Sequence, residues 1–197
     1  MRFRFICSTA LVLFAAQAAS AGGSTFSYTA PGGAINDASV QFFPLTFGTP
    51  NELIADVELE ITNLTHSSPG DLNVFLLDPF GNSLEVFDDK GNGFLIENQD
   101  FVFNDIAASE LPPSTQLVGD TYLPDQATAG AGFAQFTNGG VDAWILVVID
   151  DAATGGGSFE SFTIRGTVVP EPVTLSLLGL GAVAVLRRKR KTTATRL

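Results

Sequence analysis

The chain has 197 residues, of which 45% are hydrophobic and 16% charged, and its formal net charge is −11. Between residues 22 and 169 it holds twenty acidic residues but only two basic ones, Lys90 and Arg165, so this stretch carries a net charge of −18. Phosphate backbones and anionic lipid surfaces repel such a charge, which excludes nucleic acid as a partner and favours cations.

The first 21 residues have the three parts of a secretory signal peptide. Two arginines lie among the first four residues, residues 6–16 are mostly apolar, and Ala19-Ser20-Ala21 has the small-x-small pattern of a cleavage site. We therefore expect export and cleavage before Gly22, with Ala16-Gln17-Ala18 as an alternative site.

The only cysteine, Cys7, lies inside this signal. The mature chain therefore cannot form a disulfide, although its compartment would permit one, and its stability must come from an apolar core. About 148 residues lie from Gly22 to Val169. That length is enough for one domain with a sizeable core.

Short apolar runs rich in Phe, Val, Ile and Thr alternate here with clusters of Gly, Pro, Asn and Asp, and no amphipathic helix is evident. This pattern predicts an all-β sandwich or barrel. The expected strands, in chain order, are 25–29, 40–47, 53–62, 72–77, 84–87, 94–96, 100–103, 133–136, 143–149 and 158–169.

For several of these segments the sequence also predicts which face is buried, where the strand lies in its sheet or where it ends. Residues 53–62 alternate in period two, which places their three carboxylates on the solvent face. Pro44 indicates an edge strand or a bulge, and Pro31-Gly32-Gly33 should end the first strand. Residues 143–149 are apolar, so we expect a central strand covered on both faces. Residues 107–132 should form a long irregular connection.

A tail with three parts follows the last expected strand. Pro170-Glu171-Pro172 comes first, and residues 173–186 then form an apolar run without charge. As a helix this run spans ~21 Å, which is short of the ~30 Å hydrocarbon core of a bilayer. We therefore expect a short, temporary transmembrane helix, with its basic end in the cytoplasm. That end consists of Arg187, Arg188, Lys189, Arg190 and Lys191.

These three parts, in this order, resemble the PEP-CTERM sorting signal of Gram-negative bacteria that produce exopolysaccharide. The resemblance covers residues 170–197. It implies export through the inner membrane, a transient anchor at residues 173–186, and processing at or near Pro170-Glu171-Pro172 by an exosortase. The protein would then reach the cell surface or the exterior, among envelope or exopolysaccharide components. The two prolines suit processing, because they keep the chain extended.

Eight segments follow one another along the body, among them Asp78-Pro79-Phe80-Gly81 and Trp144-Ile145-Leu146-Val147-Val148-Ile149-Asp150. They lie at residues 57–62, 66–76, 78–82, 103–105, 119–124, 136–139, 144–150 and 157–164. Together, over residues 57–168, they resemble the P domain that accompanies subtilisin-like proprotein convertases. The resemblance implies a jelly-roll-like β-sandwich of about eight strands. Unlike the family, this chain has Thr154-Gly155-Gly156-Gly157 before its last strand, where a carboxylate is usual, and it has no catalytic domain.

The P-domain resemblance also implies a calcium site. Asp and Asn oxygens in loops are the ligands that calcium prefers, although Asp and Asn also favour turns for backbone reasons alone. We expect Asp71, Asp105 and Asp150 to be the first ligands, followed by Asp151.

His66 is the only histidine, so it is the only imidazole available for a Ser–His–Asp triad. Ser67, Ser68 and Asp71 lie close to it in sequence, but a triad is defined by geometry in space. One histidine and no mature cysteine exclude a histidine/cysteine zinc site. The sequence therefore favours a protein that is not an enzyme.

The sequence divides into a signal peptide at 1–21, a P-domain-like β-sandwich at 22–169 and a sorting tail at 170–197. We expect an exported surface or extracellular-matrix protein whose sandwich is a binding or structural module, stabilised by calcium. The alternatives are a secreted hydrolase, or an accessory module of one, and a permanently membrane-anchored adhesin.

Overall fold

The computed structural model describes residues 24–49, 53–126, 132–138, 141–153 and 155–169. The predicted signal peptide and membrane helix lie outside these residues, and no helix within them is long and apolar enough to cross a membrane. The elements are β1 (Ser24–Ile35), β2 (Ser39–Thr49), β3 (Leu53–His66), η1 (Pro69–Asp71), β4 (Leu72–Leu77), β5 (Ser83–Asp88), β6 (Ile96–Phe103), β7 (Thr121–Tyr122), η3 (Phe133–Asn138), β8 (Val141–Asp150) and β9 (Gly157–Val169).

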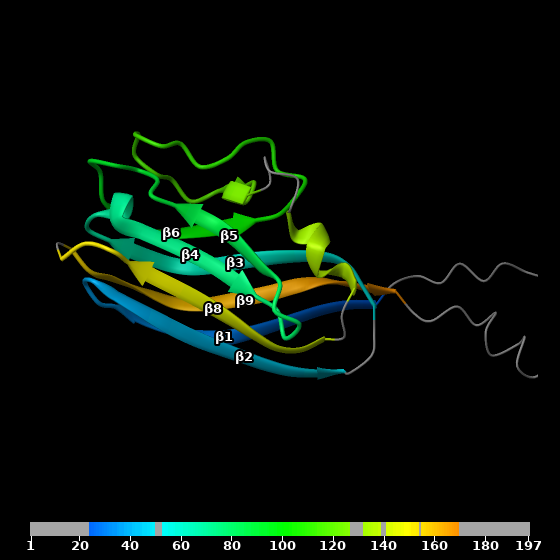
Figure 1. Cartoon of the computed structure of the whole chain (residues 1–197). Coiled ribbons are helices and arrows are strands. Elements are labelled where there is room, and N and C mark those ends of the chain that lie inside the picture. The colour runs from blue at the N-terminus through cyan, green and yellow to red at the C-terminus, as the bar shows by residue number, and fades with distance from the viewer. Residues whose placement is uncertain (1–23, 50–52, 127–131, 139–140, 154, 170–197) are drawn as a thin grey trace, which may run out of the picture.

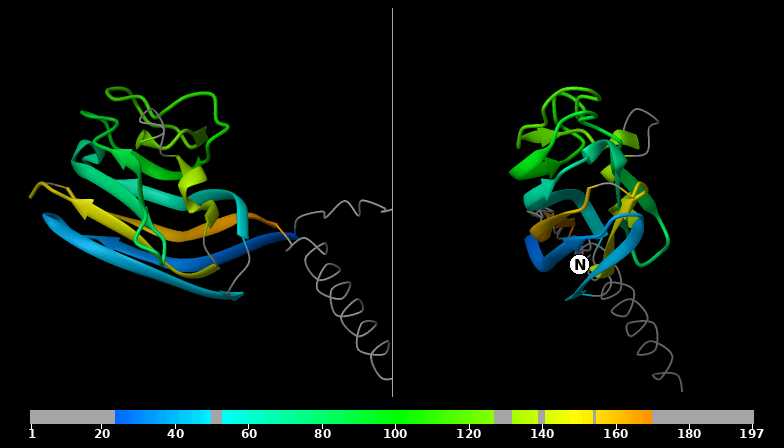
Figure 2. Two further views of the ribbon diagram at one scale, coloured as in Figure 1. Left: turned by 45° about the vertical axis from the view of Figure 1, so that its right-hand side comes forward. Right: turned by 90° about the vertical axis from the view of Figure 1, so that its left-hand side faces the viewer.

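The strands form two sheets that pack face to face, which confirms the predicted all-β sandwich (Figures 1 and 2). The five-stranded sheet has the order β1-β9-β3-β6-β7, and the four-stranded sheet has the order β2-β8-β4-β5. Ser24 pairs with Val168, so the sandwich begins and ends at the same end of the molecule. We call this the terminal end. The opposite end, where His66 pairs with Gly157, is the His66 end.

The core lies between the two sheets. In β3 the alternation predicted from sequence holds, since Leu59 and Ile61 are buried while Glu58 and Glu60 face outward. Phe162 of β9 and Trp144 of β8 are also buried, one from each sheet. Burial of such large side chains is the main source of stability in a domain without disulfides.

The first strand is longer than predicted, because β1 continues through Pro31-Gly32-Gly33 to Ile35. Pro31 lies on the outermost strand of its sheet, where its missing N–H is tolerated. A side chain at Gly32 would collide with the backbone oxygen of Phe159, so the glycine allows β1 and β9 to approach closely. Pro31, Gly32 and Gly33 therefore form part of β1 and do not end it.

Residues 133–136 were predicted as a strand, but they belong to the 3-10 helix η3. The carboxylate of Asp105 accepts hydrogen bonds from the backbone N–H groups of Phe133 and Ala134, at 2.8 and 2.9 Å. These two N–H groups belong to the first residues of η3, where a helix supplies no partner of its own for them. The prediction was wrong because this partner lies 28 residues earlier in the chain.

Residues 143–149 lie in β8, which is an interior strand of its sheet as predicted. Its inward side chains, such as Trp144 and Leu146, are buried in the core. The structure describes two layers only, so the outer face of β8 is shielded by its strand neighbours rather than by a third layer. Val147 is 6% exposed there, because it lies between Phe42 of β2 and Phe75 of β4.

The long connection predicted after β6 lies across one side of the sandwich. Its described part contains β7, and it buries Leu111 and Leu117 in the core. The carbonyl oxygens of Pro112 and Pro113 accept hydrogen bonds from the backbone N–H groups at positions 91 and 92. The connection is therefore packed structure despite its irregular sequence.

Replacing Phe162, which is 0% exposed, by alanine should lower the free energy of unfolding by about 3–5 kcal/mol, because it leaves a cavity between the sheets. Urea denaturation measures this loss. Phe80→Ala is the matched control, since Phe80 is 63% exposed and its loss should cost less than about 0.5 kcal/mol. Equal losses in the two variants would contradict the position assigned to Phe162.

Candidate functional site

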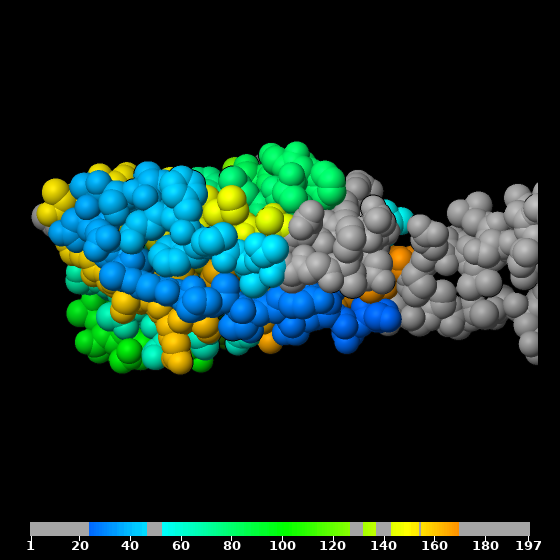
Figure 3. All heavy atoms as spheres, turned by 90° about the horizontal axis from the view of Figure 1, so that it is seen from below, coloured from blue at the N-terminus to red at the C-terminus, as the bar shows by residue number. Residues whose placement is uncertain are grey.

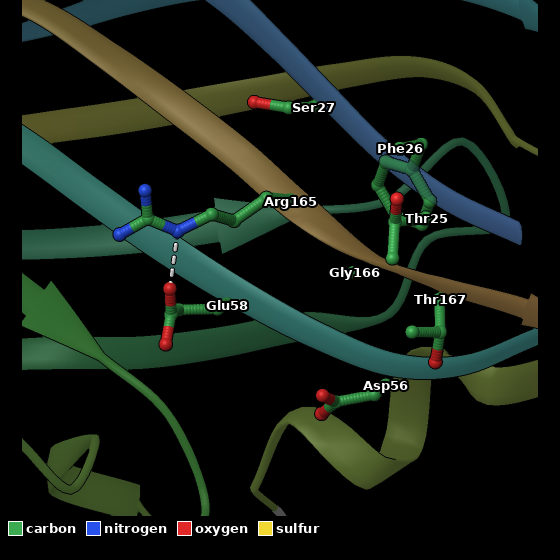
Figure 4. Close-up of a pocket in the computed structure, with 8 residues that line it drawn as sticks. All are labelled: Thr25, Phe26, Ser27, Asp56, Glu58, Arg165, Gly166 and Thr167. Carbon is green, nitrogen blue, oxygen red and sulfur yellow. Dashed lines mark hydrogen bonds and ion pairs between the residues drawn. The ribbon is translucent and has the colours of Figure 1, made fainter.

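The outer face of the five-stranded sheet carries a groove over β1, β9 and β3 (Figure 4). The groove has a volume of about 450 Å³. Outward side chains of paired strands line up in rows across a sheet. Two such rows line the groove, one formed by Ser27, Arg165 and Glu58 and the next by Thr25, Thr167 and Asp56. We call it the Arg165 groove.

Arg165 is held in place by carboxylates of the neighbouring strand. Its Nε donates to Glu58 Oε1, and its Nη1 lies 3.0 Å from Glu60 Oε2. The amide of Asn104 donates to the other oxygen of Glu58 at 2.7 Å. The hydrogen bond to Glu58 raises the pKa of the Arg165 guanidinium above its ordinary value. The guanidinium is therefore a fixed positive group on an acidic face.

The floor of the groove requires a glycine. A Cβ at Gly166 would collide with the backbone oxygen of Asp56 and would lie 3.0 Å from the ring of Phe26. The groove thus presents hydroxyls, one guanidinium and two carboxylates, those of Asp56 and Glu58. Such a surface fits a neutral, hydroxyl-bearing ligand or a cation better than an anion.

The sequence indicated only part of this site. The alternation in β3 placed Glu58 and Glu60 on the solvent face, but the pairing partner Arg165 lies 107 residues later. One signal was available, namely that Arg165 is one of two basic residues in the body. A lone arginine among twenty acidic residues is expected to be paired.

The only histidine lies at the other end of β3, in a buried pair. His66 Nε2 is 3.2 Å from Asp150 Oδ2, and both side chains are 0% exposed. The backbone N–H of Ser68 donates to His66 Nδ1 at 3.3 Å. Because Nδ1 accepts, the proton of the neutral ring lies on Nε2 and is donated to Asp150.

The hydroxyls beside His66 are bonded elsewhere. Ser67 Oγ donates to the carbonyl oxygen of Gly156 at 3.3 Å, and Ser68 Oγ donates to Asp71 Oδ2 at 2.6 Å. A second hollow of about 440 Å³ adjoins the two serines. His66 thus links the end of β3 to the end of β8. The two serines hold the turn that leads from β3 into η1.

The four predicted calcium ligands do not all meet. Asp71, Asp150 and Asp151 lie together at the His66 end, where the backbone N–H of Asp151 donates to the carbonyl oxygen of Asp71 at 3.0 Å. Asp150 is already bonded to His66, and Asp105 caps η3. Among the described residues, no group of three or more His, Cys, Asp or Glu side chains is arranged to hold a metal ion.

Two further carboxylates, Asp88 and Asp89, extend the acidic surface at this end. Burial raises the pKa of Asp89 above its usual value, and the charges of Asp88, Asp151 and Asp71 raise it further. We call the surface formed by Asp71, Asp88, Asp89 and Asp151 the acidic end. Their mutual repulsion makes it a favourable place for cations.

Lys90 lies next to this surface and pairs with Asp125 at 2.9 Å. Burial raises the pKa of the Asp125 carboxyl despite that bond. Burial also raises the pKa of Glu85, followed by the charges of Asp88 and Asp125. One lysine therefore compensates only part of the negative charge on this side.

The described residues thus define a two-sheet β-sandwich with a polar groove at one end and an acidic surface at the other. Residues 168–191 match the PEP-CTERM protein-sorting motif. The chain therefore carries that motif at its C-terminus, which implies an exported protein that is sorted to the cell surface and processed by an exosortase. The predicted positions 170–172 and 187–191 lie within the match but outside the described residues.

Three solved structures are similar to the chain at low identity. The crystal structure of FLHE has a TM-score of 0.45 and 13% identity, and the match covers 76% of this chain and 100% of that one. The serine protease of Aeromonas sobria has a TM-score of 0.38 and 14% identity, with 73% of this chain and 27% of the protease covered. Its complex with the chaperone ORF2 gives a TM-score of 0.40 and 14% identity, over 74% and 27%.

These scores assign no function to the sandwich. The chain spans about a quarter of the Aeromonas protease chains that it matches. None of the curated proteins that were compared with the chain matched it.

Proposed function

We propose that the sandwich is a jelly-roll-like, P-domain-like module that binds or supports other surface components without catalysis. The protein would be exported through the inner membrane of a Gram-negative bacterium, anchored transiently by residues 173–186, and then exposed at the cell surface or outside. The position of the sorting motif carries this proposal. The motif begins at Val168 and β9 ends at Val169, so the motif follows the sheet without a linker.

Two features support a non-catalytic role over a secreted hydrolase. His66 and Asp150 are fully buried, whereas a catalytic imidazole must reach substrate. The hydroxyls of Ser67 and Ser68 are bonded to groups other than the imidazole. The pair instead resembles a structural connection between two strand ends. The proposal of a permanently anchored adhesin differs from ours only in the fate of the tail.

The mature protein isolated from its own cells should have lost residues 173–197, because processing at or near the Pro-Glu-Pro triplet removes the apolar run and the basic end. Intact-mass spectrometry measures the C-terminus directly. A double variant, Pro170→Ala and Pro172→Ala, should accumulate uncut. A wild-type protein that still ends at Leu197 would favour the permanent adhesin instead.

We propose the Arg165 groove as the binding site, and the exopolysaccharide of the producing cells as the ligand. The groove offers hydroxyls together with charged groups that are fixed by neighbouring strands, and such groups form directional hydrogen bonds with a polyhydroxylated chain. Its excess of carboxylates favours a neutral polymer over an acidic one.

Asp56→Ala should weaken binding of purified exopolysaccharide by about tenfold or more, since a hydrogen bond to a charged group is worth about 1.5–3 kcal/mol. Asp56 is exposed, so the variant should keep its melting temperature. Isothermal titration calorimetry measures the affinity. Asp37→Ala removes the same charge from the exposed turn at the His66 end and is the control. Equal affinities for Asp56→Ala and wild type would move the site away from the groove.

We propose that calcium binds at the acidic end as a counterion to the joint charge of Asp71, Asp88, Asp89 and Asp151, and that their side chains close around it only when it is present. Calcium at ~100 times its dissociation constant should add about 2.7 kcal/mol, or about 5–10 °C in melting temperature. Thermal unfolding in chelator, calcium and magnesium measures the shift. Asp151→Asn should reduce it, and Asp37→Asn should not. Identical melting temperatures in chelator and calcium would refute the site.

A further inference from the structure

One long side of the sandwich is formed by the two outermost strands β1 and β2. Each pairs with one described strand only, β1 with β9 and β2 with β8. Figure 3 views the molecule from this side and shows the two strands lying next to each other along its length. One free edge of each sheet therefore opens on this side.

This side has almost no charge. Residues 24–49 contain one charged residue, Asp37, and it lies in the turn between the two strands. The other nineteen acidic residues between 22 and 169 lie elsewhere in the chain. We call the exposed surface of β1 and β2 the uncharged side.

An apolar strip runs from this side onto the outer face of the four-stranded sheet. Phe42 and Val40 of β2 are 64% and 52% exposed. Phe42 pairs with Val147 of β8, and Val40 pairs with Ile149, so the strip continues inward across the sheet. Large apolar side chains gathered in one place, rather than scattered singly, indicate an interaction surface.

Free sheet edges are usually protected against self-pairing by charged residues. Here β1 and β2 have prolines instead, Pro31 and Pro44, both exposed. A proline cannot donate to a new strand, so each interrupts a continuous ladder at the middle of its edge. A partner would therefore pack through side chains rather than extend the sheets.

We propose that the uncharged side binds a second copy of this chain, in a two-fold symmetric and reversible dimer. Two bodies of charge −18 repel each other in almost every orientation. Contact through β1 and β2 brings the fewest carboxylates together, because Asp37 is the one charged residue of these strands and their turn. A cationic partner would bind the acidic surfaces more strongly than the uncharged side.

The size of the side predicts how tight this dimer is. A strand of twelve residues is about 40 Å long, and two packed sheets lie ~10 Å apart. The contact would bury roughly 400–500 Å² on each copy, which is below the ~800 Å² per partner of a standard interface. The dimer should therefore be weak and should form mainly where the protein is concentrated.

Sedimentation velocity of the mature protein purified from its cells, over 1 μM to 1 mM, tests this proposal. We expect a monomer–dimer equilibrium that shifts toward dimer when salt is raised from about 0.05 to 0.5 M, because salt screens the repulsion. Phe42→Glu should weaken the dimer at least tenfold without changing the melting temperature. Phe80→Glu is the matched control, since Phe80 is equally exposed but lies in the turn between β4 and β5.

Three results would overturn the proposal. The first is a monomer at every concentration and salt condition. The second is an equal effect of Phe42→Glu and Phe80→Glu. The third is a monomer that binds neutral phosphatidylcholine vesicles through Phe42, which would mean that the uncharged side meets lipid instead of a second copy.

Discussion

The structure depends on the burial of two sheet faces against each other. Residues 24–169 contain no cysteine, so no disulfide holds β1 near β9 or β2 near β8. Trp144 from one sheet and Phe162 from the other fill the space between them, together with the alternate residues of β3. The Arg165 groove and the His66–Asp150 pair lie on the same strands, so both keep their geometry only while this core is intact.

Sequence reasoning worked where the controlling interactions are local. Short apolar runs between turn-forming clusters located most of the strands, period-two alternation gave the solvent face of β3, and Pro44 indicated an edge strand or a bulge in β2. Sequence reasoning failed where a residue far away in the chain determines the local structure. Asp105 turns residues 133–136 into a 3-10 helix across 28 positions, and Glu58 meets Arg165 across 107. Neither separation leaves a periodic signal in the sequence.

Charge divides the molecule into regions with different partners. The acidic end gathers Asp71, Asp88, Asp89 and Asp151, while the edges of β1 and β2 are almost free of charge. The terminal end joins the sorting motif, so the acidic end points away from the point of attachment. Repulsion between neighbouring copies would then be greatest far from the anchor, and the long uncharged side would be the surface along which they meet.

The pairing of the first strands with the last also sets the timing of folding. The sheet partners of β1 and β2 are β9 and β8, near the other end of the described chain, so Ser24 cannot pair before Val168 is available. Closing a loop of this length is slow compared with local contacts. The groove and the β1 and β2 edges therefore form only once β9 and β8 are available for pairing.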